Sequence, residues 1–386
     1  MVDYQVVIGL VKAALDGTPT NIPAEFPLLE YLLFARHQQI EAIMITGLLK
    51  SGVKLLREVK NILLQSAVVS SRQVAGAESL FASFRENSID YLPLKGSVLK
   101  PLYPSDELRS MGDIDVLIRV EQYDRIRSLM LAAGFREIVE SDHEYIWDKP
   151  YVHIELHKRL IPSYNKDYYA YYGDGWRLAK PTDVPFCYTM THEDTFIYLF
   201  THYAKHYRDA GVGIRQALDL YIYRKAYPDM NEQYMQETLK LLQLERFYAN
   251  TMHMLDVWFA DAEHTEASKL ISDRLFDSGV FGTYESSLQS TMLKEANSSG
   301  SVGKVKFQKW SRRMFPTFSS LKEHYPALQR WPVLLPFVWV IRCVDTILHQ
   351  RDLIKKCLKE DEISGKKSVN EYHEMLKKSG LDFNFK

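Results

Sequence analysis

The most informative stretch of this sequence is Arg109-Ser110-Met111-Gly112-Asp113-Ile114-Asp115-Val116-Leu117-Ile118. Its last five residues are apolar except for one aspartate, and three of them, spaced two apart, are β-branched, which is typical of a strand. Side chains two apart in a strand point the same way, so Asp113 and Asp115 project from one face while the β-branched residues pack on the other. The stretch therefore predicts a strand that is apolar on one face and acidic on the other.

A second acidic strand is predicted at Val152-His153-Ile154-Glu155-Leu156-His157. Glu155 projects opposite to its two apolar neighbours. Forty residues separate it from Asp115 (155 − 115), which is room for a helix, Gln122 to Ala133, and a hairpin that turns at Asp148-Lys149-Pro150. We therefore expect the two strands to lie side by side and to bring their carboxylates together.

Holding three carboxylates close together costs free energy. Like charges a few ångströms apart repel by several kcal/mol in a partly desolvated site unless cations neutralise them. Oxygen ligands suit Mg²⁺, and two such ions stabilise the attacking and leaving oxygens of a phosphoryl displacement. Asp113, Asp115 and Glu155 are therefore the candidate metal ligands and catalytic residues.

A glycine–serine turn precedes the first acidic strand, at Leu94-Lys95-Gly96-Ser97. Gly96 lets the backbone approach a phosphate closely, and the Ser97 hydroxyl and the N–H groups that follow it are donors for triphosphate oxygens. Lys95 and Arg109 are available as counter-charges for the same phosphates. We expect this turn to bind the nucleotide.

The ordered set Lys95-Gly96-Ser97, Gly112-Asp113-Ile114-Asp115 and the later Glu155 resembles the signature of the polymerase β-type nucleotidyltransferase superfamily. Within that superfamily, the Leu-Lys-Gly and Arg-x-Met-Gly-Asp-Ile-Asp elements resemble a bacterial family of uncharacterised nucleotidyltransferases. The helical segments around Thr201–His206 and Ile214–Leu220 are similar to the same family, so the resemblance covers most of the chain.

The resemblance implies an activity and a role for each acidic residue. It implies a nucleotidyltransferase that moves a nucleoside monophosphate from an NTP, with ATP expected, to a hydroxyl of a small molecule or peptide and releases pyrophosphate. Asp113 and Asp115 would bind two Mg²⁺ ions, with Mn²⁺ as an alternative. Glu155 would bind the catalytic ion and help to deprotonate the acceptor. Two alternatives remain: nucleotidylation (AMPylation) of a partner protein, and a non-catalytic nucleotide-binding protein on the same fold.

The pattern along the whole chain predicts an α+β protein. We expect an N-terminal helical segment (1–88), a nucleotidyltransferase domain with a small mixed sheet (89–190), a larger helical C-terminal domain (191–360) and a polar tail (361–386), poorly ordered or with a short helix anchored by Tyr372 and Met375. Asn297 to Ser301 is predicted to be a mobile loop. The expected helices are Ala24–Ala35, Ile40–Leu49 and Ser70–Asn87, and the expected strands are Ile89–Leu94, Ile114–Val120, Phe135–Glu140, Glu144–Trp147 and Tyr151–His157.

Composition narrows the class of protein. Forty-eight basic and 49 acidic side chains give a net charge of −1, which argues against broad nucleic-acid binding. Three cysteines without a CxxC pair argue against a disulfide framework and a cysteine-ligated zinc site, and favour a cytoplasmic protein. The start of the chain lacks the pattern of a signal peptide. The most apolar run, Trp331 to Ile341, is too short for a membrane span, which needs about 20 residues.

Several helical side chains are further candidates. His202, Lys205 and His206 share a predicted helix face, and two interpretations are open: they meet the nucleotide or the acceptor, or they form an ordinary polar face packed on the sheet. Arg215 and Asp219, four residues apart, are expected to form a helical ion pair. His153 and His157 flank Glu155 on the same strand face, but neither is assigned a role on its own.

Two segments near the C-terminus are basic or apolar. Lys304, Lys306, Lys309, Arg312 and Arg313 are interleaved with Phe307 and Trp310, a pattern that fits an anionic lipid surface or a nucleic acid. The favoured interpretation is a solvated helix face with its aromatic residues in the core. We likewise expect the Trp331–Ile341 run to fill the core of the C-terminal domain rather than to contact a membrane.

Overall fold

The computed structural model describes residues 2–280, 282–299, 301–322, 325–349, 360 and 362–381. They form two compact units. The first comprises Met1–Tyr207, Gly211–Gly282 and Ser379–Leu381, and the second comprises Arg208–Ala210, Thr283–Lys378 and Asp382–Lys386. The domain boundaries expected at 88, 190 and 360 do not coincide with this division. The reason is that contacts cross two of those boundaries. Helix α4 (Arg57–Glu86) packs on strand β5 (Val152–His157), and helix α5 (Gly96–Leu99) contacts helix α9 (Ile214–Ala226).

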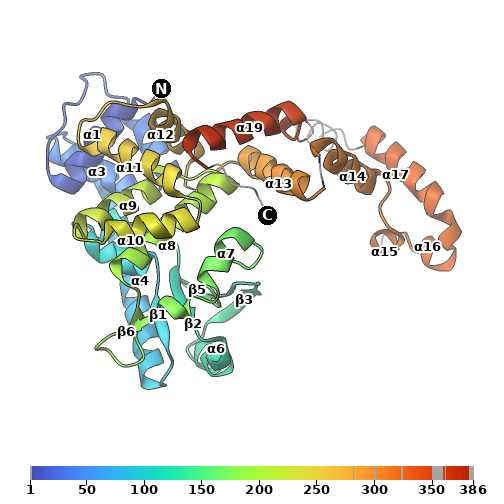
Figure 1. Cartoon of the computed structure of the whole chain (residues 1–386), viewed down its shortest axis with the longest axis horizontal. Coiled ribbons are helices and arrows are strands. Elements are labelled where there is room, and N and C mark those ends of the chain that lie inside the picture. The colour runs from blue at the N-terminus through green and yellow to red at the C-terminus, as the bar shows by residue number, and fades with distance from the viewer. Residues whose placement is uncertain are drawn as a thin grey trace. The chain divides into compact units, whose positions relative to one another are not determined.

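A five-stranded sheet lies at the centre of the first unit (Figure 1). Its strands are ordered β1-β2-β5-β4-β3, with β2 and β5 parallel and the other neighbouring pairs antiparallel. The mixed sheet and the helices around it confirm the α+β prediction, and each strand end lies within two residues of its expected position. The strands are β1 (Tyr91–Pro93), β2 (Ile114–Ile118), β3 (Arg136–Glu140), β4 (Glu144–Lys149) and β5 (Val152–His157).

One face of this sheet is sealed by two helices, α4 (Arg57–Glu86) and α6 (Tyr123–Ala132). Their apolar side chains form one core with the alternating apolar residues of the strands, including the completely buried Trp147. The long helix α4 begins at Arg57, thirteen residues before the start expected at Ser70. Its first half is largely exposed, including the apolar Leu64, Val68 and Val69, so the apolar residues there do not mark a buried helix face in the sequence.

Three helices precede α4, namely α1 (Tyr4–Asp16), α2 (Leu28–His37) and α3 (Glu41–Lys50). Helices α1 and α3 pack closely because α3 presents Gly47 to the backbone of α1, where a Cβ atom would collide with the carbonyl oxygen of Leu10. The two later helices confirm the expected segments, with starts displaced by a few residues.

The opposite face of the sheet is polar, and helices of the first unit lie beyond it. The stretch from Pro162 to Pro185 contains a helix, α7. The remaining elements of the unit are α5 (Gly96–Leu99), α7 (Lys166–Tyr172), β6 (Lys180–Pro181), β7 (Tyr188–Thr189), α8 (His192–Asp209), α9 (Ile214–Ala226), α10 (Glu232–Leu241), α11 (Glu245–Phe259) and α12 (Glu266–Ser278).

The second unit is helical in its described residues. The loop expected from Asn297 to Ser301 is wrong for Asn297 to Ser299, because helix α13 continues through Ser299. Gly300 lies outside the described residues. The polar tail carries a 14-residue helix, α19, and its Tyr372 donates a hydrogen bond to the carbonyl oxygen of Arg208, as expected of an anchoring residue. The helices are α13 (Tyr284–Ser299), α14 (Val302–Met314), α15 (Phe318–Leu321), α16 (Ala327–Arg330), α17 (Leu335–His349) and α19 (Lys366–Ser379).

The apolar run Trp331–Ile341 does not fill a core. Within it only Val338 is fully buried, in a small cluster with Leu321 and Leu328, whereas Phe337 is 67% exposed. Among the described residues, no helix is long and apolar enough to span a membrane. Cys187 is a free thiol, and Cys357 lies outside the described residues.

Candidate active site

Two carboxylates meet on the polar face of the sheet. Strands β2 and β5 are parallel and place Asp115 directly beside Glu155 in register. The β-branched residues of β2 point to the sealed face, so the acidic side chains point away from it, as the two-residue period predicts. Asp115 is only 2% exposed and the Glu155 side chain 19%, so both charges are largely withdrawn from water.

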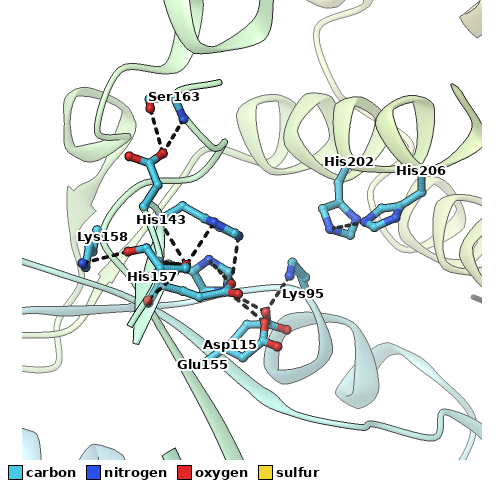
Figure 2. Close-up of polar contacts among 12 residues, drawn as sticks. Lys95, Asp115, His143, Glu155, His157, Lys158, Ser163, His202 and His206 are labelled. Carbon is cyan, nitrogen blue, oxygen red and sulfur yellow. Dashed lines mark hydrogen bonds and ion pairs between the residues drawn. The ribbon is translucent and has the colours of Figure 1, made fainter. Parts of the chain in front are cut away.

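Asp115 is held by two partners (Figure 2). Nζ of Lys95 donates to Oδ1 at 2.6 Å, and Nε2 of His157 lies 2.8 Å from the same oxygen. Lys95 adopts a positive φ of 39°, which is uncommon for a side chain with a Cβ, and precedes the short helix α5. This backbone conformation belongs to the turn from which the ammonium group reaches the strand.

Burial and charge set the ionisation of these groups. Burial raises the pKa of Asp115, but Lys95 and His157 outweigh that effect and lower it, so this carboxyl is ionised. Burial, together with the neighbouring Asp115, raises the pKa of Glu155 to about 8. Burial also lowers the pKa of His157, which keeps the imidazole neutral. At neutral pH, Lys95 thus balances the charge of Asp115, while the raised pKa of Glu155 keeps that carboxyl protonated.

Two residues that line this site, His143 and Glu144, were not singled out from the sequence. Glu144 pairs with His157 across the β4–β5 hairpin, and its Oε2 lies 3.9 Å from Nδ1 of His157 and 2.9 Å from Nε2 of His143. The signal was present in the hairpin: a turn after Lys149 that pairs it with Val152 also pairs Glu144 with His157. His157, to which the sequence assigned no role, lies between Glu144 and the Asp115–Glu155 pair and contacts all three carboxylates.

The donor atoms fit a divalent cation. One ligand atom each from Asp115, Glu155 and His157 lie within 4.8 Å of one another, and a second such group is formed by His143, Glu144 and His157. Carboxylate oxygens suit Mg²⁺ or Mn²⁺, and a bound cation would relieve the repulsion that raises the pKa of Glu155. Asp113 lines the same cavity, but among the described residues it is not part of either group.

The carboxylates form the floor of a cavity of about 360 Å³. Helices α8 and α9 supply its opposite wall, with His202, Lys205 and His206 from the first and Arg215 from the second. The helix that carries His202 and His206 faces the acidic cluster in Figure 2. The cavity therefore has an acidic floor and a wall that carries basic side chains, all within the first unit.

The two histidines of α8 contact each other. Their Nε2 atoms lie 3.1 Å apart, so one is the donor and the other the acceptor. Burial, together with His206 and Lys95, lowers the pKa of His202 well below its usual value, so this ring is neutral. The structure thus places the three expected α8 residues at the cavity, while their role in binding stays a prediction.

Arg109 is engaged in a buried ion pair. Its guanidinium donates to both oxygens of Asp219, from Nε at 3.2 Å and from Nη2 at 3.0 Å, and Tyr103 donates to the same carboxylate. The predicted Arg215–Asp219 pair is therefore wrong: Asp219 is taken by a residue far away in the sequence, and Arg215 donates to Gln39 Oε1 at 2.6 Å instead. Arg109 lines the cavity but also ties the loop before β2 to α9.

The glycine–serine turn differs from its expected role in one respect. A Cβ atom on Gly96 would approach Sδ of Met111 to 2.6 Å, so the space over this glycine holds the side chain of the loop before β2. Oγ of Ser97 is buried and, within the described part of the chain, has no hydrogen-bond partner. Lys95 lines the cavity, whereas Gly96 and Ser97 are not among the described lining residues.

A family model described as "uncharacterised nucleotidyltransferase" matches residues 27–260. The matched region holds every residue of the cavity floor and the α8–α9 wall, and it is more than half of the chain. The chain belongs to this nucleotidyltransferase family. The resemblance inferred from the motifs is thereby confirmed. Nucleotidyl transfer is the activity of this class, and an NTP is its substrate.

Two other comparisons do not identify the substrate or the acceptor. A search of curated proteins returned no match for this nucleotidyltransferase. One solved structure is similar, the solution structure of the antibiotic-resistance factor ANT(2'')-Ia, with 10% identity and a TM-score of 0.33 over 50% of this chain and 100% of that one. A likeness at this score carries no argument about substrate or acceptor.

Proposed function

We propose that this protein transfers a nucleoside monophosphate from an NTP, with ATP expected, to a hydroxyl of a small molecule or peptide and releases pyrophosphate, in a reaction that depends on Mg²⁺. One observation carries the proposal: Asp115 and Glu155 lie in register on the floor of a cavity whose opposite wall carries basic side chains. That arrangement suits a substrate with a polyphosphate chain that is bound together with divalent cations.

Asp113, Asp115 and Glu155 are the residues that would hold the cations. Bound divalent ions supply charge stabilisation for the oxygens between which the phosphoryl group moves. Lys95 keeps Asp115 ionised and fixed in place, since its Nζ donates to Oδ1. Glu155, whose pKa is raised to about 8, would lose its proton on cation binding and accept the proton of the acceptor hydroxyl as that oxygen attacks.

The cavity wall supports binding of the phosphates. Lys205 and Arg215 line it opposite the acidic floor, and the neutral His202 lines it together with its neighbour His206. Arg109, committed to Asp219, positions the loop before β2 rather than offering a free guanidinium. Of the glycine–serine turn, Lys95 lines the cavity, and phosphate binding by Gly96 and Ser97 stays a prediction.

The test uses NTP labelled in its α-phosphate. We expect label to move from NTP to an acceptor in a bacterial metabolite extract in the presence of Mg²⁺ and to stay on the nucleotide when the metal is chelated. Nucleotide binding without any transfer, over a full set of metals and extracts, would overturn the proposal in favour of a non-catalytic nucleotide-binding protein.

The acceptor class is tested in the same reactions. Mass spectrometry of small molecules and peptides should show the added mass of one nucleoside monophosphate. The same added mass found only on intact co-purified proteins would instead identify nucleotidylation of a partner protein. Glu155→Gln serves as the matched control, because it keeps the size of the side chain and removes its charge.

A further inference from the structure

Unpartnered apolar side chains are concentrated in one part of the second unit, from α14 to α17. Both tryptophans that are more than half exposed among the described residues lie here, Trp310 at 53% and Trp331 at 58%. Soluble proteins rarely expose apolar side chains in such density unless they bind something there. We call this set the apolar surface; it consists of Phe307, Trp310, Phe315, Trp331, Val333, Phe337, Val340 and Ile341.

Helix α14 shows two distinct faces. Val305 is buried and Phe307 and Trp310, three residues apart, share a face that points to solvent. The favoured sequence interpretation, with these aromatic residues in the core, is therefore wrong, because α14 uses a different face to pack on α13.

Helix α17 is arranged in the same way. Val338 is buried in the small cluster with α15 and α16, whereas Phe337, Val340 and Ile341, at spacings of three and four residues, are 57–67% exposed. The helix is thus apolar on two sides, and only one side has a partner among the described residues. An outer face of this kind is costly in water, at about 25 cal/mol per Å² of apolar surface.

Aromatic contacts connect the two helices into one surface. The Phe307 and Trp310 rings lie 6.0 Å apart, Trp310 and Phe315 6.1 Å, and Phe315 and Trp339 5.2 Å. Nε1 of Trp339 donates to the carbonyl oxygen of Pro316 at 3.0 Å, which fixes α17 to the segment after α14. The exposed rings of α14 and the apolar outer face of α17 therefore belong to one packed substructure, which Figure 1 shows around α14–α17.

The segment that carries the apolar surface is strongly basic. Between Glu295 and Asp345 the sequence contains eight Lys or Arg residues and one acidic residue, Glu323, in a chain whose overall charge is −1. On α14, Lys304 and Lys306 lie on either side of the Phe307–Trp310 stripe by their position along the helix. Apolar side chains bordered by lysine and arginine are the pattern of a segment that lies in the interface of an anionic bilayer.

We propose that α14–α17 bind the surface of an anionic lipid bilayer, with the apolar surface inserted among the headgroups and the basic side chains on the phosphates. A second copy of the chain is disfavoured as the occupant, because a symmetric pairing would set two equally basic surfaces against each other. A nucleic acid is disfavoured because Val340 and Ile341 on the outer face of α17 are aliphatic, and aliphatic side chains neither stack on bases nor bind phosphates. Among the described residues, no helix combines the length and the apolar character that are needed to cross a membrane.

The full-length protein is tested by co-sedimentation with vesicles of phosphatidylcholine alone and of equal parts phosphatidylcholine and phosphatidylglycerol. Since each basic residue near an anionic surface contributes about fivefold to binding, we expect the anionic vesicles to bind at least about a hundredfold more tightly, and less tightly as salt is raised. Failure to bind the anionic vesicles, or equal binding to both, overturns the proposal.

Two double variants divide the interaction into its parts. Phe337→Ser with Ile341→Ser removes apolar side chains that make no core contact, and should weaken binding about tenfold or more. Lys304→Glu with Lys306→Glu, the two lysines that flank the Phe307–Trp310 stripe, should weaken it at least about 25-fold. The matched controls are Leu241→Ser, at a 76% exposed apolar residue of the first unit, and Lys54→Glu with Lys60→Glu, two exposed lysines there.

The controls and the alternative occupants decide the outcome. Controls that keep wild-type binding support the proposal, and controls that lose as much as the variants overturn it, because binding then follows net charge or general apolarity. If the anionic vesicles are not bound, the proposal is overturned, and two results would then identify another occupant. Loss of dimerisation in Phe337→Ser with Ile341→Ser would indicate a second copy of the chain, and binding to an oligonucleotide would indicate a nucleic acid. Circular dichroism of each variant verifies that the helices are retained.

Discussion

The two faces of the five-stranded sheet are built from the same strands but have different roles. On one face, alternate residues of β2, β4 and β5 join α4 and α6 in a core that excludes water. On the other face, the intervening residues Asp115, Glu155, His157 and Glu144 are gathered at a cavity and hold charges in a partly desolvated place. The sealed face stabilises the protein and the open face costs stability. Each face can therefore be altered without the other.

The largest expected effect is on the open face. Asp115→Asn should reduce nucleotidyl transfer by about three orders of magnitude, because it removes a charge that stabilises the transition state through a cation. Turnover of α-labelled NTP measures the loss. The melting temperature should fall as well, because the amide leaves the Lys95 ammonium without its buried counter-charge, so turnover is compared per folded molecule. A variant with wild-type turnover would contradict the metal-ligand assignment.

The matching change on the sealed face should do the reverse. Trp147→Ala removes a completely buried side chain and should lower the free energy of unfolding by about 3–5 kcal/mol. Denaturant unfolding measures the loss, and turnover per folded molecule should remain close to that of the wild type at low temperature. A loss of turnover as large as that of Asp115→Asn would show that the two faces are not separable.

The buried Arg109–Asp219 pair tests how the open face is held in shape. Arg109→Met leaves the 7% exposed Asp219 carboxylate with Tyr103 as its donor and should destabilise the protein by about 3–5 kcal/mol. The double variant Arg109→Met with Asp219→Leu should recover much of that loss, because no buried charge remains. Equal stability of the single and double variants would contradict a buried charge pair.

The last expected effect is a pH dependence of the stability of the metal-free protein. The pKa of Glu155 rises from 4.5 when unfolded to about 8 when folded, so the folded state binds more protons in that interval. The free energy of unfolding should therefore fall as pH rises from about 5 to 8 in the presence of a chelator. Glu155→Gln should show a shallower fall, and identical slopes for the two proteins would contradict the raised pKa.

The sequence predicted the sheet well because its signals are local. Alternation in β2 and β5 placed the acidic residues on one face, and the hairpin turn brought the second strand back. Glu144 was missed because a single glutamate at the start of a strand has no distinguishing pattern until the hairpin register is known. The three α8 residues were identified by their spacing alone.

Long-range pairing and exposed apolar faces could not be read from the sequence. Arg215 lies one helical turn from Asp219, so the rule for residues four apart on a helix predicted that pair. Asp219 instead pairs with Arg109, which is distant in the sequence but adjacent in the fold. For Phe307 and Phe337, the rule that apolar residues are buried fails because α14 and α17 each have one covered and one uncovered side. The outcome depends on which side finds a partner, and periodicity does not specify that.

The contact of Met111 with Gly96 has a consequence for how this family varies. The sulfur atom fills the space where a Cβ would stand, so the turn before α5 and the loop before β2 interlock at one point. Among relatives, a residue larger than glycine at position 96 should therefore occur together with a shorter one at position 111. The two motifs are then inherited as a single unit rather than as separate signatures.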